Sequence, residues 1–108
     1  MEEIVKKVCE FHGVDFNEFK MHSRKMNIIR AKHQAIYLLR EFTPWPLHRI
    51  GSLFDLDHST VIHALKSVKD QCDTDLYYAR EVQMLTEIIN PKPVPERVEV
   101  WAENDYIQ

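Results

Sequence analysis

Apolar residues recur at intervals of three or four positions over most of the first 90 residues, which is the pattern of amphipathic helices. A glycine at position 13, prolines at positions 44, 46 and 91 and acidic N-cap candidates divide the pattern into segments. The sequence therefore predicts helices over residues 2–12, 15–20, 26–42, 47–54, 58–69 and 73–90. Residues 21–27 interrupt the pattern and are predicted to form a basic loop.

The spacing within each segment also predicts which side chains face the core. The long helix over residues 26–42 should bury Ile28, Ala35, Leu39 and Phe42 and expose Arg30, Lys32, His33 and Arg40. The next two helices should bury Leu47, Ile50, Leu53 and Phe54, and then Val61, Ile62, Leu65 and Val68. The last helix should bury Leu76, Ala79, Val82, Leu85 and Ile89.

The helices over residues 47–54 and 58–69 are joined by a very short corner. Pro46 suits the first turn of the earlier helix, Gly51 suggests a close approach between helices, and Asp57 is a good N-cap for the later one. Two helices joined in this way form a helix-turn-helix unit, whose second helix can lie in the major groove of DNA.

Charge is divided unevenly along the 108 residues, whose formal net charge is −3. Residues 20–70 hold nine basic and four acidic residues, whereas both flanking segments are acidic. This middle part also holds five of the six histidines, namely His22, His33, His48, His58 and His63. A basic middle containing the helix-turn-helix pattern favours a nucleic-acid partner.

Several other classes of protein are not expected. The chain has no apolar run long enough to span a bilayer and no signal peptide, so we expect a cytoplasmic protein of one domain. Cys9 and Cys72 are expected to be reduced thiols, and Cys9 with His12 lacks the second pair that a metal site needs. We expect no cofactor, no small-molecule substrate and no enzymatic activity, because neither an activated nucleophile nor a GxxxxGK[ST] phosphate loop is present.

Three runs are specific enough to indicate a family: SRKMNIIRAKHQAIYLLREFT, LHRIGSLF and DHSTVIHA. Together they resemble the C-terminal helix-turn-helix domain, domain IV, of the bacterial replication initiator DnaA. In that family a basic loop precedes a helix with ARQxAMYL, an L-x-x-IG-x-x-F helix and a D-H-[ST]-T-V-x-H-A recognition helix. The resemblance covers about residues 1–70, and DHSTVIHA is its most specific part.

The resemblance implies a fold class and a function. The fold would be a small all-α domain with a helix-turn-helix of the Trp-repressor-like type. Outside the part that the resemblance covers, the residue pattern predicts an additional C-terminal helix over residues 71–90. It predicts a proline-rich linker and an acidic tail, with a short strand-like alternation, over residues 91–108. The function would be sequence-specific binding of double-stranded DNA in replication initiation or its regulation, without ATPase activity.

The resemblance also implies the roles of individual residues. Bases would be contacted by Arg24 in the minor groove and by Asp57, His58, Ser59 and Thr60 in the major groove. Phosphates would be contacted by Ser23, Lys25, Lys32, His33, Leu47, His63 and Lys66, with Leu47 acting through its backbone amide. Asp57 is also expected to cap its helix, and His63 is equally compatible with a hydrogen bond to a neighbouring helix.

The chain departs from the family at three places. Asp55-Leu56 replaces the usual Gly-Arg before the Asp-His pair, Met26 stands where a third basic residue is common, and an acidic extension follows Lys69. In that extension we expect Trp101 and Tyr106 to act as aromatic anchors for a protein partner or for docking on the basic face. These departures support an alternative function, a protein-interaction module that keeps the fold with weak or no DNA binding.

Overall fold

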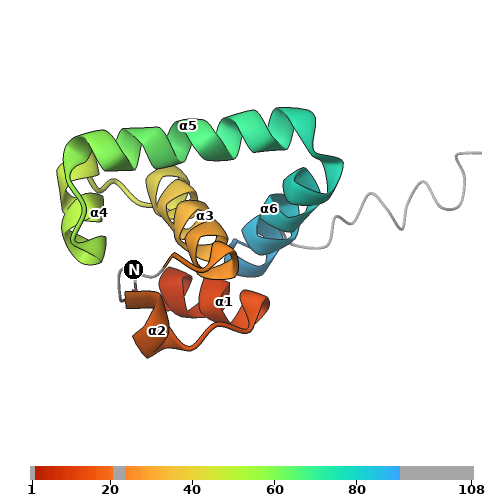
Figure 1. The fold of residues 1–108 in the computed structure, drawn as a ribbon, viewed down its shortest axis with the longest axis horizontal. Helices are drawn as coiled ribbons and strands as arrows, with labels where there is room; N and C mark the ends of the chain where they lie inside the picture. Colours follow the sequence, from red (N-terminus) through yellow and green to blue (C-terminus); the bar gives the residue numbers. More distant parts are fainter. Residues whose placement is uncertain (1, 21–23, 91–108) are drawn as a thin grey trace, which may run out of the picture.

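The computed structural model describes residues 2–20 and 24–90, and this part of the chain is all-α (Figure 1). Its helices are α1 (Glu2–His12), α2 (Phe16–Lys20), α3 (Met26–Phe42), α4 (Leu47–Phe54), α5 (His58–Thr74) and α6 (Leu76–Ile89). The predicted fold class is confirmed for these residues. The predicted linker and tail, with Trp101 and Tyr106, and the predicted phosphate contact Ser23 lie outside the described residues.

Helix α3 runs through the middle of the domain (Figure 1). It packs against α5 on one side and against α1 on the other, while α4 and α6 adjoin the two ends of α5. Six of its apolar side chains are completely buried, namely Ile28, Ala31, Ala35, Ile36, Leu38 and Leu39. Because its neighbours cover most of its surface, α3 is apolar over a wider arc than that of a helix with one buried face.

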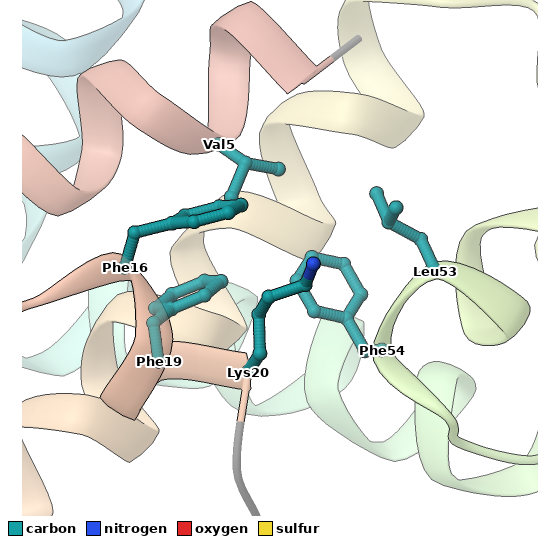
Figure 2. A pocket seen from close by; sticks show the side chains of 6 residues that line it. All are labelled: Val5, Phe16, Phe19, Lys20, Leu53 and Phe54. Atoms are coloured by element: carbon teal, nitrogen blue, oxygen red, sulfur yellow. The ribbon is translucent and has the colours of Figure 1, made fainter.

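Helix α2 packs against the end of α4 and so connects the N-terminal helices to the helix-turn-helix. The ring of Phe19 meets the ring of Phe54 edge-on, with centroids 5.7 Å apart and planes at 66°. Figure 2 shows these two rings beside Phe16, Val5 and the aliphatic stem of Lys20. An edge-to-face pair of this kind adds to the burial of apolar area, so α2 supports the end of α4.

The corner between α4 and α5 is a Schellman-type helix end. The amide of Asp55 donates to Ser52 O and the amide of Leu56 donates to Gly51 O at 2.8 Å, while Asp55 is left-handed with φ 57°. A Cβ on Gly51 would lie 2.5 Å from Leu56 O and 3.1 Å from Val61 Cγ2. The predicted close approach at Gly51 is therefore confirmed, and it lets α5 start directly behind α4.

Helix α5 continues five residues beyond its predicted end, and a single residue separates it from α6. No glycine or proline stands between residues 57 and 90, so nothing local stops α5 near Lys69. Asp75 is the turning point because its carboxylate accepts from the amides of Tyr77 and Tyr78 and caps α6.

Two residues predicted to face the core are exposed. Ile62 is 45% exposed because α5 buries Val61, Ala64 and Val68, and Ile62 lies about 100° around the helix from Val61. Leu76 is 71% exposed because α6 buries Tyr78, Val82 and Leu85 instead. Both apolar side chains are therefore on the surface.

A polar network joins α1, α3 and α6 inside this framework. His12 Nε2 lies 2.7 Å from Gln34 Oε1, and Gln34 Nε2 donates to Glu81 Oε1 at 3.0 Å. The same carboxylate oxygen accepts from Arg30 Nε at 2.8 Å. Gln34 is fully buried, so the network satisfies a polar side chain that would otherwise destabilise the core.

Cys9 and His12 both have structural roles in this part of the fold. His12 is engaged with Gln34, and no group of three metal-binding side chains occurs in the part of the chain that the structure describes. Burial raises the pKa of the Cys9 thiol to about 11, and the carboxylates of Asp15 and Glu10 add to the effect. Cys9 is therefore a protonated core residue at neutral pH.

No helix among residues 2–20 and 24–90 has the length and apolarity needed to cross a membrane.

Candidate nucleic-acid interface

The start of α5 presents a short polar cluster to solvent. Asp57 precedes the helix and its Oδ1 accepts from the amide of Thr60 at 2.8 Å. This bonding, aided by His58, holds the pKa of Asp57 below its usual range. Asp57, His58, Ser59 and Thr60 are all exposed, so the predicted capping is confirmed and the four side chains are accessible.

The basic side of α3 lies next to this cluster. Arg24, Lys32 and His33 share one surface hollow with Thr60 of α5. The rest of its lining is apolar and consists of Ile29, Ile36, Leu56 and Ala64. Residues separated by up to 40 positions in sequence thus form one surface in which cationic side chains adjoin the start of α5.

Lys32 and His33 are less exposed than the sequence pattern predicts. Lys32 retains only 8% of its surface, because its stem packs in the hollow between α3 and α5, and burial lowers its pKa. Burial, together with the neighbouring charge of His63, also lowers the pKa of His33. The prediction that Lys32 is on an open polar side is therefore wrong, but its place beside Arg24 and Thr60 suits an anion that fits into the hollow.

The two described cations of the loop before α3, Arg24 and Lys25, point in different directions. Arg24 is exposed and lines the hollow. Lys25 Nζ lies 2.7 Å from Glu18 Oε2 of α2, which directs this side chain toward the N-terminal helices. A phosphate contact by Lys25 would compete with this exposed salt bridge, which contributes little stability.

The start of α4 offers backbone rather than side-chain groups. Leu47 is half-buried and packs against the core, and no side chain caps the helix at Pro46. The first amides of a helix lack partners within it, so this end can donate to an anion. Nearby, Trp45 packs against the core, and the guanidinium of Arg49 lies over its ring at 4.2 Å, so Trp45 is a packing residue.

His63 and Lys66 are exposed along α5 beyond the first turn. The sequence reading missed three polar residues near them, Asn27 of α3 and Ser67 and Gln71 of α5. These line a second hollow that also contains His33 and Arg30. Only the crossing of α3 and α5 brings them together, and no local pattern in the sequence indicates that crossing.

The chain has clear relatives. Residues 1–68 match the family described as "Bacterial dnaA protein helix-turn-helix". The chain is 31% identical over 93 residues to the chromosomal replication initiator protein DnaA of Bacteroides thetaiotaomicron, a match that covers 85% of this chain and 20% of the relative. It is 37% identical over 86 residues to the protein of the same name from Streptococcus pyogenes, covering 79% of this chain and 19% of the relative.

The matches cover only a small part of each relative. This chain spans about a fifth of the length of these relatives, so it corresponds to one part of them. The match with the Bacteroides protein leaves too few residues outside for α6 to lie beyond it. The likeness therefore includes the C-terminal helix as well as the helix-turn-helix.

Proposed function

This chain belongs to the family of bacterial DnaA helix-turn-helix domains, and we propose that it binds double-stranded DNA in a sequence-specific manner. The binding would serve replication initiation or its regulation. The observation that carries the proposal is the juxtaposition of Arg24, Lys32 and His33 with the exposed start of α5. A recognition helix uses its first residues to reach base edges, while neighbouring cations hold the phosphates.

Base recognition would come from the start of α5 in the major groove. The Asp57 carboxylate uses Oδ1 to cap the helix, so its second oxygen can accept from a cytosine amino group. His58 and the Thr60 methyl can pack against thymine methyl groups, and the Ser59 hydroxyl can donate or accept. Arg24 would enter an adjacent narrow, A·T-rich minor groove, whose negative potential attracts a guanidinium.

Phosphate contacts would position this recognition surface. The residues that support them are Lys25, Lys32, His33, His63, Lys66 and the Leu47 amide, together with Ser23. Neutralising about four to five phosphates would make the logarithm of affinity fall with the logarithm of salt concentration at a slope near −4. Such contacts add affinity for every sequence, whereas the residues around Asp57 would discriminate among them.

Selection from a pool of random duplexes with the whole chain tests the proposal. The selected duplexes should share a short common sequence, and Arg24→Ala and His58→Ala should each weaken specific binding by about 1–3 kcal/mol. Arg40→Ala is the matched control, because Arg40 is an exposed arginine at the opposite end of α3. Recovery of unrelated sequences would contradict sequence-specific binding.

The alternative, a protein-interaction module without DNA affinity, is favoured by two observations. The acidic Asp55 stands directly before the start of α5, and α6 exposes several large apolar side chains. Under this alternative no duplex would bind measurably at moderate salt. The selection experiment therefore separates the two functions.

The acidic tail is a candidate competitor of DNA for the basic surface. We propose that residues 91–108, with Trp101 and Tyr106, compete with DNA for the basic face or engage another protein. Removal of the chain after Asn90 should raise DNA affinity if the tail competes, since it removes four acidic and two basic residues. Unchanged affinity would rule out the competition.

A further inference from the structure

Helix α6 carries a second apolar side that the domain does not cover. Tyr77, Met84 and Ile88 are 81%, 50% and 45% exposed. At about 100° per residue, their spacings of seven and four place them within roughly 20° of one line along the helix. The core is contacted by a different side, formed by Tyr78, Val82 and Leu85. Contiguous exposed apolar residues of this kind mark contact sites.

Two opposite charges border this apolar line. Arg80 and Glu87 are both exposed and, seven residues apart, lie on the same flank of α6. They stand about 10 Å apart along the helix, too far for a salt bridge within it. Neither takes part in a salt bridge with another residue of the described chain.

The order of these charges makes the surface complementary to itself. In an antiparallel pair of identical helices related by a two-fold axis, the same flanks of both helices face each other. With the axis midway between residues 80 and 87, each Arg80 lies opposite the Glu87 of the other copy. Met84 then lies near the axis, and Tyr77 and Ile88 cover the two ends of the contact.

From this pattern we propose that α6 docks against α6 of a second copy of this chain, forming an antiparallel, two-fold symmetric dimer. In Figure 1, α6 adjoins the C-terminal end of α5, whereas the candidate DNA-binding residues lie at its N-terminal end. Both interfaces can therefore be occupied together, and a two-fold dimer would present two recognition helices to two half-sites.

The contact is expected to be small. One 14-residue helix from each partner forms a contact at the small end of specific interfaces, which typically bury about 1,200–2,000 Å². The dimer is therefore concentration-dependent, and it does not require DNA. The dimer proposal is tested on the protein without DNA. A negative result for dimerisation is therefore distinguishable from a negative result for DNA binding.

Sedimentation of the whole chain over a hundredfold range of concentration tests the proposal. The chain should pass from monomer to dimer as concentration rises, and Met84→Glu should weaken the dimer at least about tenfold. Gln83→Ala is the control, since Gln83 is exposed on α6 away from the apolar line and this change adds no charge beside Arg80 or Glu87, so it should leave the dimer unchanged. Circular dichroism verifies that each variant retains its helices.

Charge reversal tests the antiparallel register. Arg80→Glu alone and Glu87→Arg alone place like charges opposite each other at two points, so each should weaken the dimer at least about tenfold. An equimolar mixture of the two variants restores both opposite-charge pairs and should dimerise. The double variant Arg80→Glu, Glu87→Arg should also dimerise. These residues are on the surface, so the test does not depend on a core substitution.

Three results with the whole chain would overturn the proposal. They are a monomer at every concentration, a dimer that the single charge reversals leave intact, and a mixture of those variants that stays monomeric. A chain that dimerises only after removal of residues beyond Asn90 would also overturn it, because the tail would then be the occupant of this surface.

Discussion

Arg30 of α3 and Glu81 of α6 form a salt bridge, with Nε and Oε1 2.8 Å apart, across 51 positions of sequence. The guanidinium of Arg30 also lies over the ring of Tyr78, 4.6 Å from its centroid. The oxygen that accepts from Arg30 accepts from Gln34 as well. This salt bridge therefore links α6 to α3, the helix that carries the basic side of the candidate interface.

Glu81→Gln should reduce the acid sensitivity of the fold. Burial alone would raise the pKa of Glu81, but hydrogen bonds from Arg30 and Gln34, with the charges of Arg30 and His12, outweigh it and lower the pKa. A lowered carboxyl pKa contributes stability that is present above the unfolded value of about 4.5 and is lost as pH falls through the folded value. Urea unfolding measured between pH 6 and pH 3.5 should show a smaller loss for the variant. Parallel curves for the two proteins would contradict this role.

Gly51→Ala should destabilise the helix-turn-helix. The added Cβ would overlap Leu56 O and press on Val61 Cγ2, and neither backbone nor packed core can move away easily. We expect a loss of about 1–3 kcal/mol in the free energy of unfolding, the usual range for overpacking. Ser52→Ala is the neighbouring control at an exposed position, where the change should stay within roughly 0.5 kcal/mol. A neutral Gly51→Ala would show that the corner is looser than the structure indicates.

Substitutions of Asp55 separate backbone strain from charge. Asp55 is left-handed, a conformation that glycine adopts most easily, and it places an anion beside the start of α5. Asp55→Asn removes the charge, so its affinity for DNA should rise, most clearly at low salt. Asp55→Gly removes the same charge and also the side-chain cost of the left-handed conformation. The Asp55→Gly variant should therefore match the Asp55→Asn variant in DNA affinity. Its free energy of unfolding should be higher by up to about 1 kcal/mol.

Anisotropy titrations and thermal unfolding of the two variants would measure these effects. Equal stability of Asp55→Gly and Asp55→Asn would show that the left-handed corner is not strained. An unchanged affinity in both variants would place Asp55 away from the DNA.

Much of this fold follows from sequence pattern, and the exceptions have identifiable causes. Helix positions, the Asp57 cap and the role of Gly51 rest on local rules, so they could be predicted. The end of α5 could not, because Asp75 rather than a glycine or proline turns the chain. Sequence pattern alone places Ile62 and Leu76 in the core, because nothing in the neighbouring sequence distinguishes an exposed apolar residue from a buried one beside it.

The candidate site shows the same division. DHSTVIHA places Asp57 to Thr60 at the start of a helix, and the structure finds them there. The burial of Lys32 and the hollow that it shares with Arg24 and Thr60 depend on how α3 crosses α5. Such a crossing results from long-range packing, which hydrophobic periodicity in one segment does not specify.

DNA affinity should rise as pH falls from about 8 to 6, and His33→Gln should reduce this dependence. The pKa of His33 lies below its ordinary value of 6.5 in the unbound protein, so His33 is neutral at pH 7. It is faced by His63 from α5 and by Arg24, Lys32 and Arg30 around the two hollows. A bound phosphate would offset these positive charges and favour the imidazolium, so DNA binding should take up a proton. Equal pH dependence in both proteins would remove His33 from the phosphate contacts.

The most direct measurement of DNA binding is a fluorescence anisotropy titration of the whole chain against a selected duplex and a scrambled one at several salt concentrations. We predict saturable binding, a preference for the selected duplex that Arg24→Ala reduces, and a slope of log affinity against log salt near −4. No binding at low salt, or a slope near zero, would contradict the proposal that this chain is a DNA-binding helix-turn-helix.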